Sequence, residues 1–223
     1  SYLVKLGLDG DVSVCNSLLS MYARCMDFSS AMDVFHETRD RDVVTWNSIL
    51  TACVQHQHLE VVFELFNLLQ RSVPSLDGIS LNNVLSASAE LGYLEMVKQV
   101  HAYTFKVGLV NDTMLNNGLI DTYAKCGSLD DAAKHFEMMG TNCDVFSWSS
   151  LIVGYAQSGY ARKALDLFAR MRNLGIKPNH VTFVGVLTAC SRVGFVDEGC
   201  YYYSIMEPEH GILPTREQCS CVI

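Results

Sequence analysis

Histidine, cysteine and carboxylate side chains, which most often carry chemistry, occur in this chain without a recognisable catalytic spacing. His58 and Glu60 have the spacing of the H-x-E half of a zinc deaminase motif, but a C-x-x-C half occurs nowhere in the sequence. Cys219 and Cys221 form a C-x-C pair with no second pair at zinc-finger spacing. Glycine-rich phosphate loops and G-x-S-x-G motifs are also missing. We therefore expect no enzyme activity, no metal site and no cofactor.

The polar residues with the clearest regularity are asparagines that return within a repeated segment. Residues 16–25 return as residues 117–126 with an offset of 101 residues, and Trp46 returns as Trp148. A copied segment of this length is typical of repeat proteins, in which each unit packs only on its neighbours.

Six complete units of 31 to 36 residues, flanked by two partial ones at 1–11 and 216–223, account for the chain. The complete units are 12–42, 43–77, 78–112, 113–144, 145–179 and 180–215. Position 24 of each unit is bulky, and we expect it to lie in the core. Its six occupants are Phe35, Phe66, His101, Phe136, Phe168 and Tyr203.

Each unit contains two amphipathic stretches with apolar residues near i, i+3, i+4 and i+7, a spacing that predicts a helical hairpin. In the unit 145–179 the pattern predicts helices over 145–156 and 161–174, with a turn at Gly159. Strand signals are short, as at 43–45. We predict an all-α chain forming one continuous stack of hairpins with a concave surface.

Composition places limits on the partners of this stack. The chain is 49% apolar and 18% charged and has no run of 18 apolar residues, so we expect no membrane span. The net charge of −8 opposes long-range attraction to nucleic acid.

Cys25 and Cys126 share one repeat position and Cys53 and Cys190 another, which favours buried thiols in a reducing compartment over disulfides. Because the chain begins and ends inside repeats, we expect a fragment of a longer array.

The sequence resembles the pentatricopeptide repeat family over its whole length. Four motifs carry the resemblance: VVTWNSIL at 43–50, VFSWSSLI at 145–152, ALDLFARM at 164–171 and GIKPN at 175–179. The family folds as a right-handed superhelical solenoid of helix-turn-helix repeats (an α-α superhelix) and binds single-stranded RNA. The tetratricopeptide family, which mostly binds peptides, keeps a constant spacing of 34 residues, and this chain does not.

The unit lengths are similar to the family's plant-type alternation of S, P and L motifs. The resemblance implies S repeats at 12–42 and 113–144, P repeats at 43–77 and 145–179, and L repeats at 78–112 and 180–215. The partial segment 1–11 would end an L repeat, and 216–223 would begin another unit.

In this family the fifth residue of a unit and its last residue together face one RNA base, because an amide or hydroxyl on a rigid helix can bond to a Watson–Crick edge. The implied base-reading pairs are Asn16 with Asp42, Asn47 with Asp77, Asn82 with Asp112, Asn117 with Asp144, and Ser149 with Asn179. Asn with Asp implies uracil and, less strongly, cytosine, and Ser with Asn implies adenine. L-type units follow this code poorly, and Val184 of the last unit has no hydrogen-bonding group, so these two nucleotides stay undetermined. An ordinary helix-capping role is the alternative explanation for these residues.

Two further sets of residues follow from the resemblance. Arg24, Lys125 and Arg192 share position 13, where the family often places a basic residue toward the RNA backbone. Val44, Met114 and Phe146 occupy position 2, which sandwiches the base in this family, although a role in the core between helices is equally consistent with the pattern.

Proteins of this type act in plant mitochondria or chloroplasts, in RNA editing or processing. We therefore expect single-stranded RNA as the partner, with editing-complex proteins and self-association as further contacts, and a targeting peptide outside this segment. The competing interpretation is a helical scaffold for protein partners, supported by the isoelectric point near 5.3 and by the tyrosine run 201–203.

Overall fold

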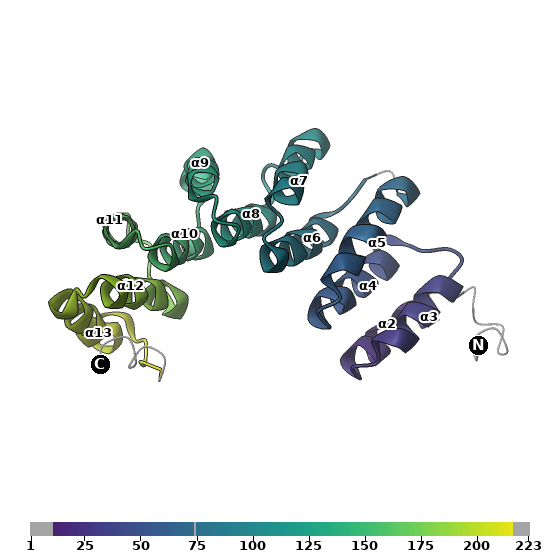
Figure 1. Ribbon diagram of the computed structural model, residues 1–223, viewed down its shortest axis with the longest axis horizontal. Helices are drawn as coiled ribbons and strands as arrows, with labels where there is room; N and C mark the ends of the chain where they lie inside the picture. Colours follow the sequence, from purple (N-terminus) through teal and green to yellow (C-terminus); the bar gives the residue numbers. More distant parts are fainter. Residues whose placement is uncertain (1–10, 74, 216–223) are drawn as a thin grey trace. The chain divides into compact units, whose positions relative to one another are not determined.

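Pairs of antiparallel helices follow one another along the chain in a computed structural model that describes residues 11–73 and 75–215 (Figure 1). No strand occurs among these residues. The first helices of the pairs are α2 (Val12–Arg24), α4 (Val43–Gln55), α6 (Gly78–Leu91), α8 (Thr113–Lys125), α10 (Val145–Gln157) and α12 (His180–Val193). The second helices are α3 (Phe28–Glu37), α5 (Leu59–Ser72), α7 (Leu94–Val107), α9 (Leu129–Met139), α11 (Ala161–Asn173) and α13 (Val196–His210), and a short 3₁₀ turn η1 (Gly140–Asn142) follows α9.

The first helices begin at residues 12, 43, 78, 113, 145 and 180, the positions at which the sequence analysis begins its complete units. In the unit 145–179 each helix ends within one residue of the predicted end, at Gln157 and Asn173. The prediction of an all-α chain of helical hairpins is confirmed. Residues 1–10 of the predicted partial unit 1–11, the partial unit 216–223, and with them Cys219 and Cys221, lie outside the described residues.

The chain divides into two compact units, residues 1–115 and 116–223. In the first unit α2 packs on α4 and α4 on α6, and in the second α10 packs on α12, so the first helices stack directly on one another. Three second helices, α3, α5 and α11, pack against their own first helix and the next one, as α5 does with α4 and α6. Gly185 permits the close approach of α12 to α10, because a Cβ atom there would lie 3.0 Å from side-chain carbons of Ile152 and Val153.

The first helices start where they do because the last residue of the preceding segment caps them. In each cap a side-chain oxygen accepts a hydrogen bond from the backbone N–H two or three residues on, which satisfies donors that have no partner inside the helix. The capping residues are Asp11, Asp42, Asp77, Asp112, Asp144 and Asn179.

The turns inside the hairpins need a left-handed residue, which glycine adopts without steric cost. Gly92, Gly159 and Gly194 have φ values of 65°, 84° and 77°. Met26 and Gln57 take the same conformation, each with φ of 61°, at the corresponding turns of the first two hairpins. An L-residue is strained in this region by about 1–2 kcal/mol.

The core consists mainly of consecutive apolar residues in the first helices, such as Ile49 with Leu50 and Leu151 with Ile152, and of position 24. Phe35, Phe66, Phe136 and Phe168 are buried as predicted, whereas His101 and Tyr203 are only half-buried. The prediction of buried thiols is correct for Cys53 and Cys190. It is wrong for Cys25, which is exposed, and for Cys126, which is half-buried, because both follow directly on the last residue of a first helix.

The tyrosine run in α13 is also less exposed than expected. Tyr201 is exposed, but Tyr202 packs edge-on against Phe168 with ring centroids 5.4 Å apart, and Tyr203 is half-buried. Among the described helices, none is both long enough and apolar enough to cross a bilayer.

Candidate functional site

The first helices bring polar side chains of neighbouring units into contact. Asn47 lies one turn into α4 and donates from Nδ2 to the Asp77 carboxylate at 2.8 Å, while Asp77 caps α6 through the backbone N–H of Ser80 at 2.8 Å. The same arrangement occurs at Asn117 and Asp144, with Nδ2 to carboxylate oxygen distances of 3.0 and 3.2 Å. These are two of the predicted base-reading pairs.

Two further pairs are in contact with longer or different bonds. Asn16 donates to Asp42 at 3.3 Å. Ser149 lies 3.3 Å from Asn179 Oδ1, but its hydroxyl also lies 2.7 Å from the carbonyl oxygen of Val145 in its own helix.

The fifth predicted pair is not joined. Asn82 donates to the carbonyl oxygen of Gly78, one turn earlier in α6, at 3.0 Å, and no hydrogen bond to Asp112 is present within the described part of the chain. Asp112 instead caps α8 through the N–H of Leu115 at 3.0 Å, and its carboxylate lies where a side chain on Gly78 would be. The structure therefore brings together four of the five predicted pairs.

A hydroxyl side chain that the sequence analysis did not single out completes these contacts. Ser80 Oγ lies 2.6 Å from Asn47 Oδ1, Ser147 Oγ donates to Asn117 Oδ1, and Thr182 Oγ1 lies 2.7 Å from Ser149 Oγ. Each hydroxyl belongs to the third residue of the following unit. Its signal in the sequence is a Ser or Thr at position 3, present in four units and replaced by Val14 and Leu115 in the other two.

The position-2 side chains face solvent. Val44 is 57% exposed, Met114 65% and Phe146 61%, so the alternative of a core position does not hold for them. Ile79 and Val181 at the same position are about half exposed. Large apolar side chains beside a hydrogen-bonding pair offer flat contacts for a planar ring.

Around Asn47 these features form one pocket of about 360 Å³, within the range of roughly 300–1,000 Å³ typical of ligand sites. Asn47 lies in its lining together with the position-2 residues of its own unit and of the next, Val44 and Ile79. Arg24 and Gln55, both at position 13, also line it. The pocket combines an amide, two apolar side chains and a cation, which suits a base with its phosphate.

The basic residues predicted at the RNA backbone differ in their surroundings. Arg24 is exposed and lines the pocket around Asn47. Lys125 forms an ion pair with Asp121 at 2.8 Å within α8. Arg192 donates to the carbonyl oxygen of Gln157 at 2.7 Å and so caps the C-terminal end of α10. Of these three residues, only Arg24 has its charged group outside an ion pair or a helix cap formed by the described residues.

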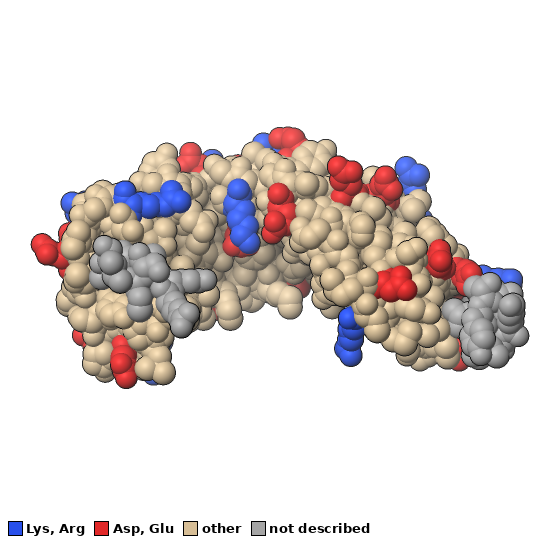
Figure 2. Space-filling view, turned by 60° about the horizontal axis from the view of Figure 1, so that its bottom comes forward, with Lys and Arg blue, Asp and Glu red and all other residues tan. Residues whose placement is uncertain are grey.

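The carboxylate of Asp42 is held in its ionised form. Partial burial opposes ionisation of Asp42, but hydrogen bonds from the N–H and hydroxyl of Thr45, and from Asn16, keep the pKa of Asp42 below its usual value. Each capping carboxylate also lies at the N-terminal, positive end of a helix dipole, which offsets part of its charge. On the face seen in Figure 2, basic groups are scattered among acidic ones and form no continuous stripe.

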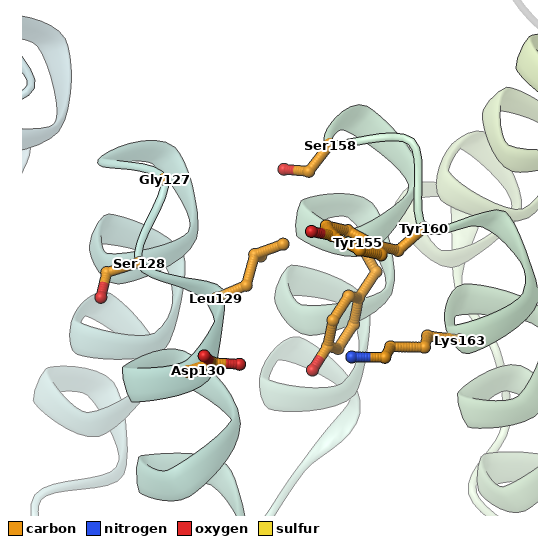
Figure 3. A pocket seen from close by; sticks show the side chains of 8 residues that line it. All are labelled: Gly127, Ser128, Leu129, Asp130, Tyr155, Ser158, Tyr160 and Lys163. Atoms are coloured by element: carbon orange, nitrogen blue, oxygen red, sulfur yellow. The ribbon is translucent and has the colours of Figure 1, made fainter.

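A second pocket, of about 450 Å³, lies at the hairpin turns of the second compact unit (Figure 3). Lys163 points between Tyr155 and Tyr160, with its ammonium 5.2 Å from each ring centroid. The pocket is lined by residues of the turns Gly127–Asp130 and Ser158–Tyr160 and contains none of the predicted base-reading residues. We therefore attribute this pocket to the way the two turns pack against each other and assign it no part in base reading.

A stack of helical hairpins with a polar pair at four of its junctions is the arrangement of a modular repeat protein, and comparisons with known proteins identify which kind. Sequence profiles of the PPR repeat match residues 13–43, 44–72 and 117–143, and the PPR repeat family profile matches residues 144–192. The chain belongs to the pentatricopeptide repeat family.

Curated relatives from Arabidopsis thaliana are similar over the whole chain. Pentatricopeptide repeat-containing protein At3g53360, mitochondrial, is 51% identical over 224 residues, covering 100% of this chain and 29% of the relative. Pentatricopeptide repeat-containing protein At3g57430, chloroplastic, is 36% identical over 233 residues, covering 100% of this chain and 26% of the relative. The chain therefore spans less than a third of the length of either relative.

Solved structures share the fold. The crystal structure of the pentatricopeptide repeat protein PPR10 in complex with an 18-nt psaJ RNA element superposes with a TM-score of 0.80 at 16% identity, over 99% of this chain and 33% of that chain. The crystal structure of PPR10 from maize gives a TM-score of 0.67 at 21% identity, over 99% of this chain and 32% of that chain.

Proposed function

We propose that this chain binds single-stranded RNA with sequence preference, one nucleotide to each repeat. The observation that carries the proposal is the pocket at Asn47, where an amide bonded to Asp77 lies among the exposed apolar side chains of Val44 and Ile79. Stacking on such side chains holds a base without regard to its identity, and the amide can then distinguish one Watson–Crick edge from another.

The division into S, P and L units and the base-reading role of the pairs belong to this proposal. With the first repeat on the 5′ side, the pairs imply U, U, undetermined, U, A, undetermined. The third nucleotide is undetermined because Asn82 donates its hydrogen bond to the Gly78 carbonyl oxygen and not to Asp112. The last is undetermined because Val184 carries no polar group.

The chain contributes recognition to a longer protein. Both relatives described above bear mitochondrial or chloroplastic names, and we infer the same compartments for the parent of this segment. Editing or processing of an organellar transcript is the role that fits. This array would recognise the target sequence, and any reaction would be carried out by other residues or proteins. Family members are RNA-binding repeat proteins, and we assign no catalytic residue to this chain.

Affinity is expected to be modest and salt-sensitive. Four effective pairs supply stacking and hydrogen bonds of about 1–3 kcal/mol per nucleotide, and part of that free energy is consumed in ordering the strand. The net charge of −8 weakens long-range attraction further.

Fluorescence anisotropy with labelled oligonucleotides tests the proposal. The chain is titrated at low and moderate salt against an RNA carrying U-U-N-U-A, a scrambled RNA of the same composition, and the DNA version of the first. The expected result is tightest binding to the first RNA, weakening as salt rises. Equal affinity for all three, or none, would refute base reading and favour a scaffold for protein partners.

A further inference from the structure

In three units the hydroxyl of the third residue contacts the fifth residue of the unit before it. Ser80, the third residue of α6, lies with its hydroxyl 2.6 Å from Asn47 Oδ1, while Asn47 Nδ2 donates to Asp77 at 2.8 Å. Ser147 makes the corresponding contact with Asn117 Oδ1. The amides of Asn47 and Asn117 are therefore held at both ends, by a carboxylate on the nitrogen side and by a hydroxyl on the oxygen side.

The other two asparagines form an internal comparison. At Asn16 the hydroxyl of Thr45 bonds to Asp42 at 2.8 Å, as that of Ser80 does to Asp77, but within the described part of the chain Thr45 makes no hydrogen bond to the amide. Asn16 Oδ1 is buried without a hydrogen bond from the described residues, and the bond from Asn16 to Asp42 is longer, at 3.3 Å. At Asn82 the third residue of the next unit is Leu115, which has no hydroxyl. Asn82 then bonds to the Gly78 carbonyl and makes no bond to Asp112.

The chemistry explains why both contacts are needed to orient the amide. An ionised carboxylate can only accept hydrogen bonds, so it fixes the side on which the NH₂ group lies. A hydroxyl donor on the opposite side fixes the carbonyl oxygen and prevents the amide from turning toward its own helix. One N–H and one oxygen lone pair of the amide then remain for a ligand.

These two free groups match the edge of uracil. Uracil presents N3–H as a donor with carbonyl oxygens on both sides as acceptors, so one amide can donate to a carbonyl and accept from N3–H at once. For a base held in place by stacking, an amide that turns about its terminal bond offers the two groups in reverse order and no longer faces the same carbonyl and N3–H.

We propose that Ser80 and Ser147 are positioning residues, whose hydroxyls orient the base-reading amides of the preceding units, and that Leu115 is the reason the unit 78–112 does not read a base. This inference rests on the proposed function. The third residue of a unit thus belongs to the reading site of the unit before it.

The loss test compares Ser80→Ala with Ser80→Thr. The alanine removes the hydroxyl and keeps the backbone N–H through which Asp77 caps α6, and threonine restores the hydroxyl, as at Thr182. Ser88→Ala is the matched control, because Ser88 is also buried and its hydroxyl donates within α6, to the Val84 carbonyl oxygen, rather than to a base-reading residue. The readout is the ratio of affinities for RNAs with U or A opposite the unit 43–77.

Ser80→Ala is expected to lower this ratio by about 3- to 10-fold, the value of one hydrogen bond. The ratio for Ser80→Thr and for Ser88→Ala should stay within about twofold of the unsubstituted chain. Discrimination at the adenine opposite Ser149 should be unchanged in all three variants, because the hydroxyl of Ser80 contacts Asn47 and Asp77, which both belong to the unit 43–77.

The gain test substitutes Leu115. Leu115→Thr introduces a hydroxyl, and Leu115→Val has the same shape without one, so any loss of packing at this fully buried position is shared by both variants. Leu115→Thr is expected to produce a preference for U opposite the unit 78–112 that Leu115→Val lacks.

The outcomes separate the two proposals. If the unsubstituted chain shows no base preference, the proposed function fails and the positioning role fails with it. If it prefers U-U-N-U-A but Ser80→Ala and Ser147→Ala keep their full U-to-A ratios, the function stands and the positioning role is overturned. If the Leu115 variants unfold, the two serine variants decide the question.

Discussion

Trp148 packs edge-on against Phe136, with ring centroids 4.7 Å apart and the rings 85° from coplanar. Trp46 makes the same contact with Phe35 at 4.9 Å. In both cases the phenylalanine is at position 24 of one hairpin and the tryptophan one turn into the first helix of the next. The two hairpins that are joined by the Asn117–Asp144 hydrogen bond are therefore also joined by a buried aromatic contact, between Phe136 and Trp148.

Phe136→Ala should lower the free energy of unfolding by about 3–5 kcal/mol, because it leaves a cavity beneath Trp148. Phe146→Ala is the control, since that ring is 61% exposed and its loss should change stability by no more than about 0.5 kcal/mol. Urea unfolding followed by circular dichroism measures both. Similar midpoints for the two variants would show that position 24 is not the core position described here.

Gln57→Gly should stabilise the chain. Gln57 has φ of 61°, in the region where Gly159 and Gly194 lie in later hairpins, and relief of that strain is worth about 0.5–1 kcal/mol after the added flexibility of the unfolded chain is subtracted. Gln57→Ala retains the strain and should give no gain. Thermal unfolding of the two variants checks the prediction, and a lower midpoint for the glycine variant would contradict it.

Thiol labelling should follow burial. Burial raises the pKa of Cys53 to about 12, so its thiolate fraction at pH 8 is about one in ten thousand. Burial, with Glu198 nearby, raises the pKa of Cys190 to about 11. Exposed Cys25 and Cys200 should react with iodoacetamide at pH 8, and the two buried thiols only after unfolding. Mass spectrometry of the labelled peptides gives the order, and early labelling of Cys53 would contradict it.

Arg24 and Arg192 occupy the same repeat position but should behave differently when replaced by alanine. Arg24→Ala removes a cation from the pocket at Asn47 and should reduce the slope of log affinity against log salt by about 0.7, with little change in stability. Arg192→Ala removes the donor to the Gln157 carbonyl and should cost about 1–2 kcal/mol of stability. Anisotropy across a salt series and urea unfolding separate the two effects. A salt slope for Arg24→Ala equal to that of the unsubstituted chain would show that Arg24 contacts no phosphate.

The sequence predicts the helices and most of the core because helical periodicity, capping residues and aromatic positions return in each unit and reinforce one another. Contacts between units are harder to predict. Nothing in the local pattern indicates that Asn82 turns to Gly78 while Asn47 reaches Asp77, since that choice depends on whether Leu115 or Ser80 stands opposite. Ser and Thr are also ordinary residues in the first turn of a helix, so the contact of Ser80 with Asn47 is visible only in three dimensions.

Exchange of one reading pair should change base preference without changing the fold. Ser149→Asn combined with Asn179→Asp reproduces the side chains of the Asn47–Asp77 pair, and Thr182 supplies the hydroxyl that Ser80 supplies there. Asp at 179 can still cap α12 through the N–H of Thr182, which Asn179 now does at 2.9 Å, so stability should be retained. The preferred nucleotide opposite this unit should shift from A to U.

Anisotropy with RNAs that differ only at that nucleotide measures the shift, and Asn179→Asp alone is the control that separates the added charge from the new pair. A double variant that keeps its preference for A would refute base reading by Ser149 and Asn179. A general loss of affinity that the single variant shares would instead trace to repulsion between the new carboxylate and the RNA backbone, because at −8 the chain already repels phosphate.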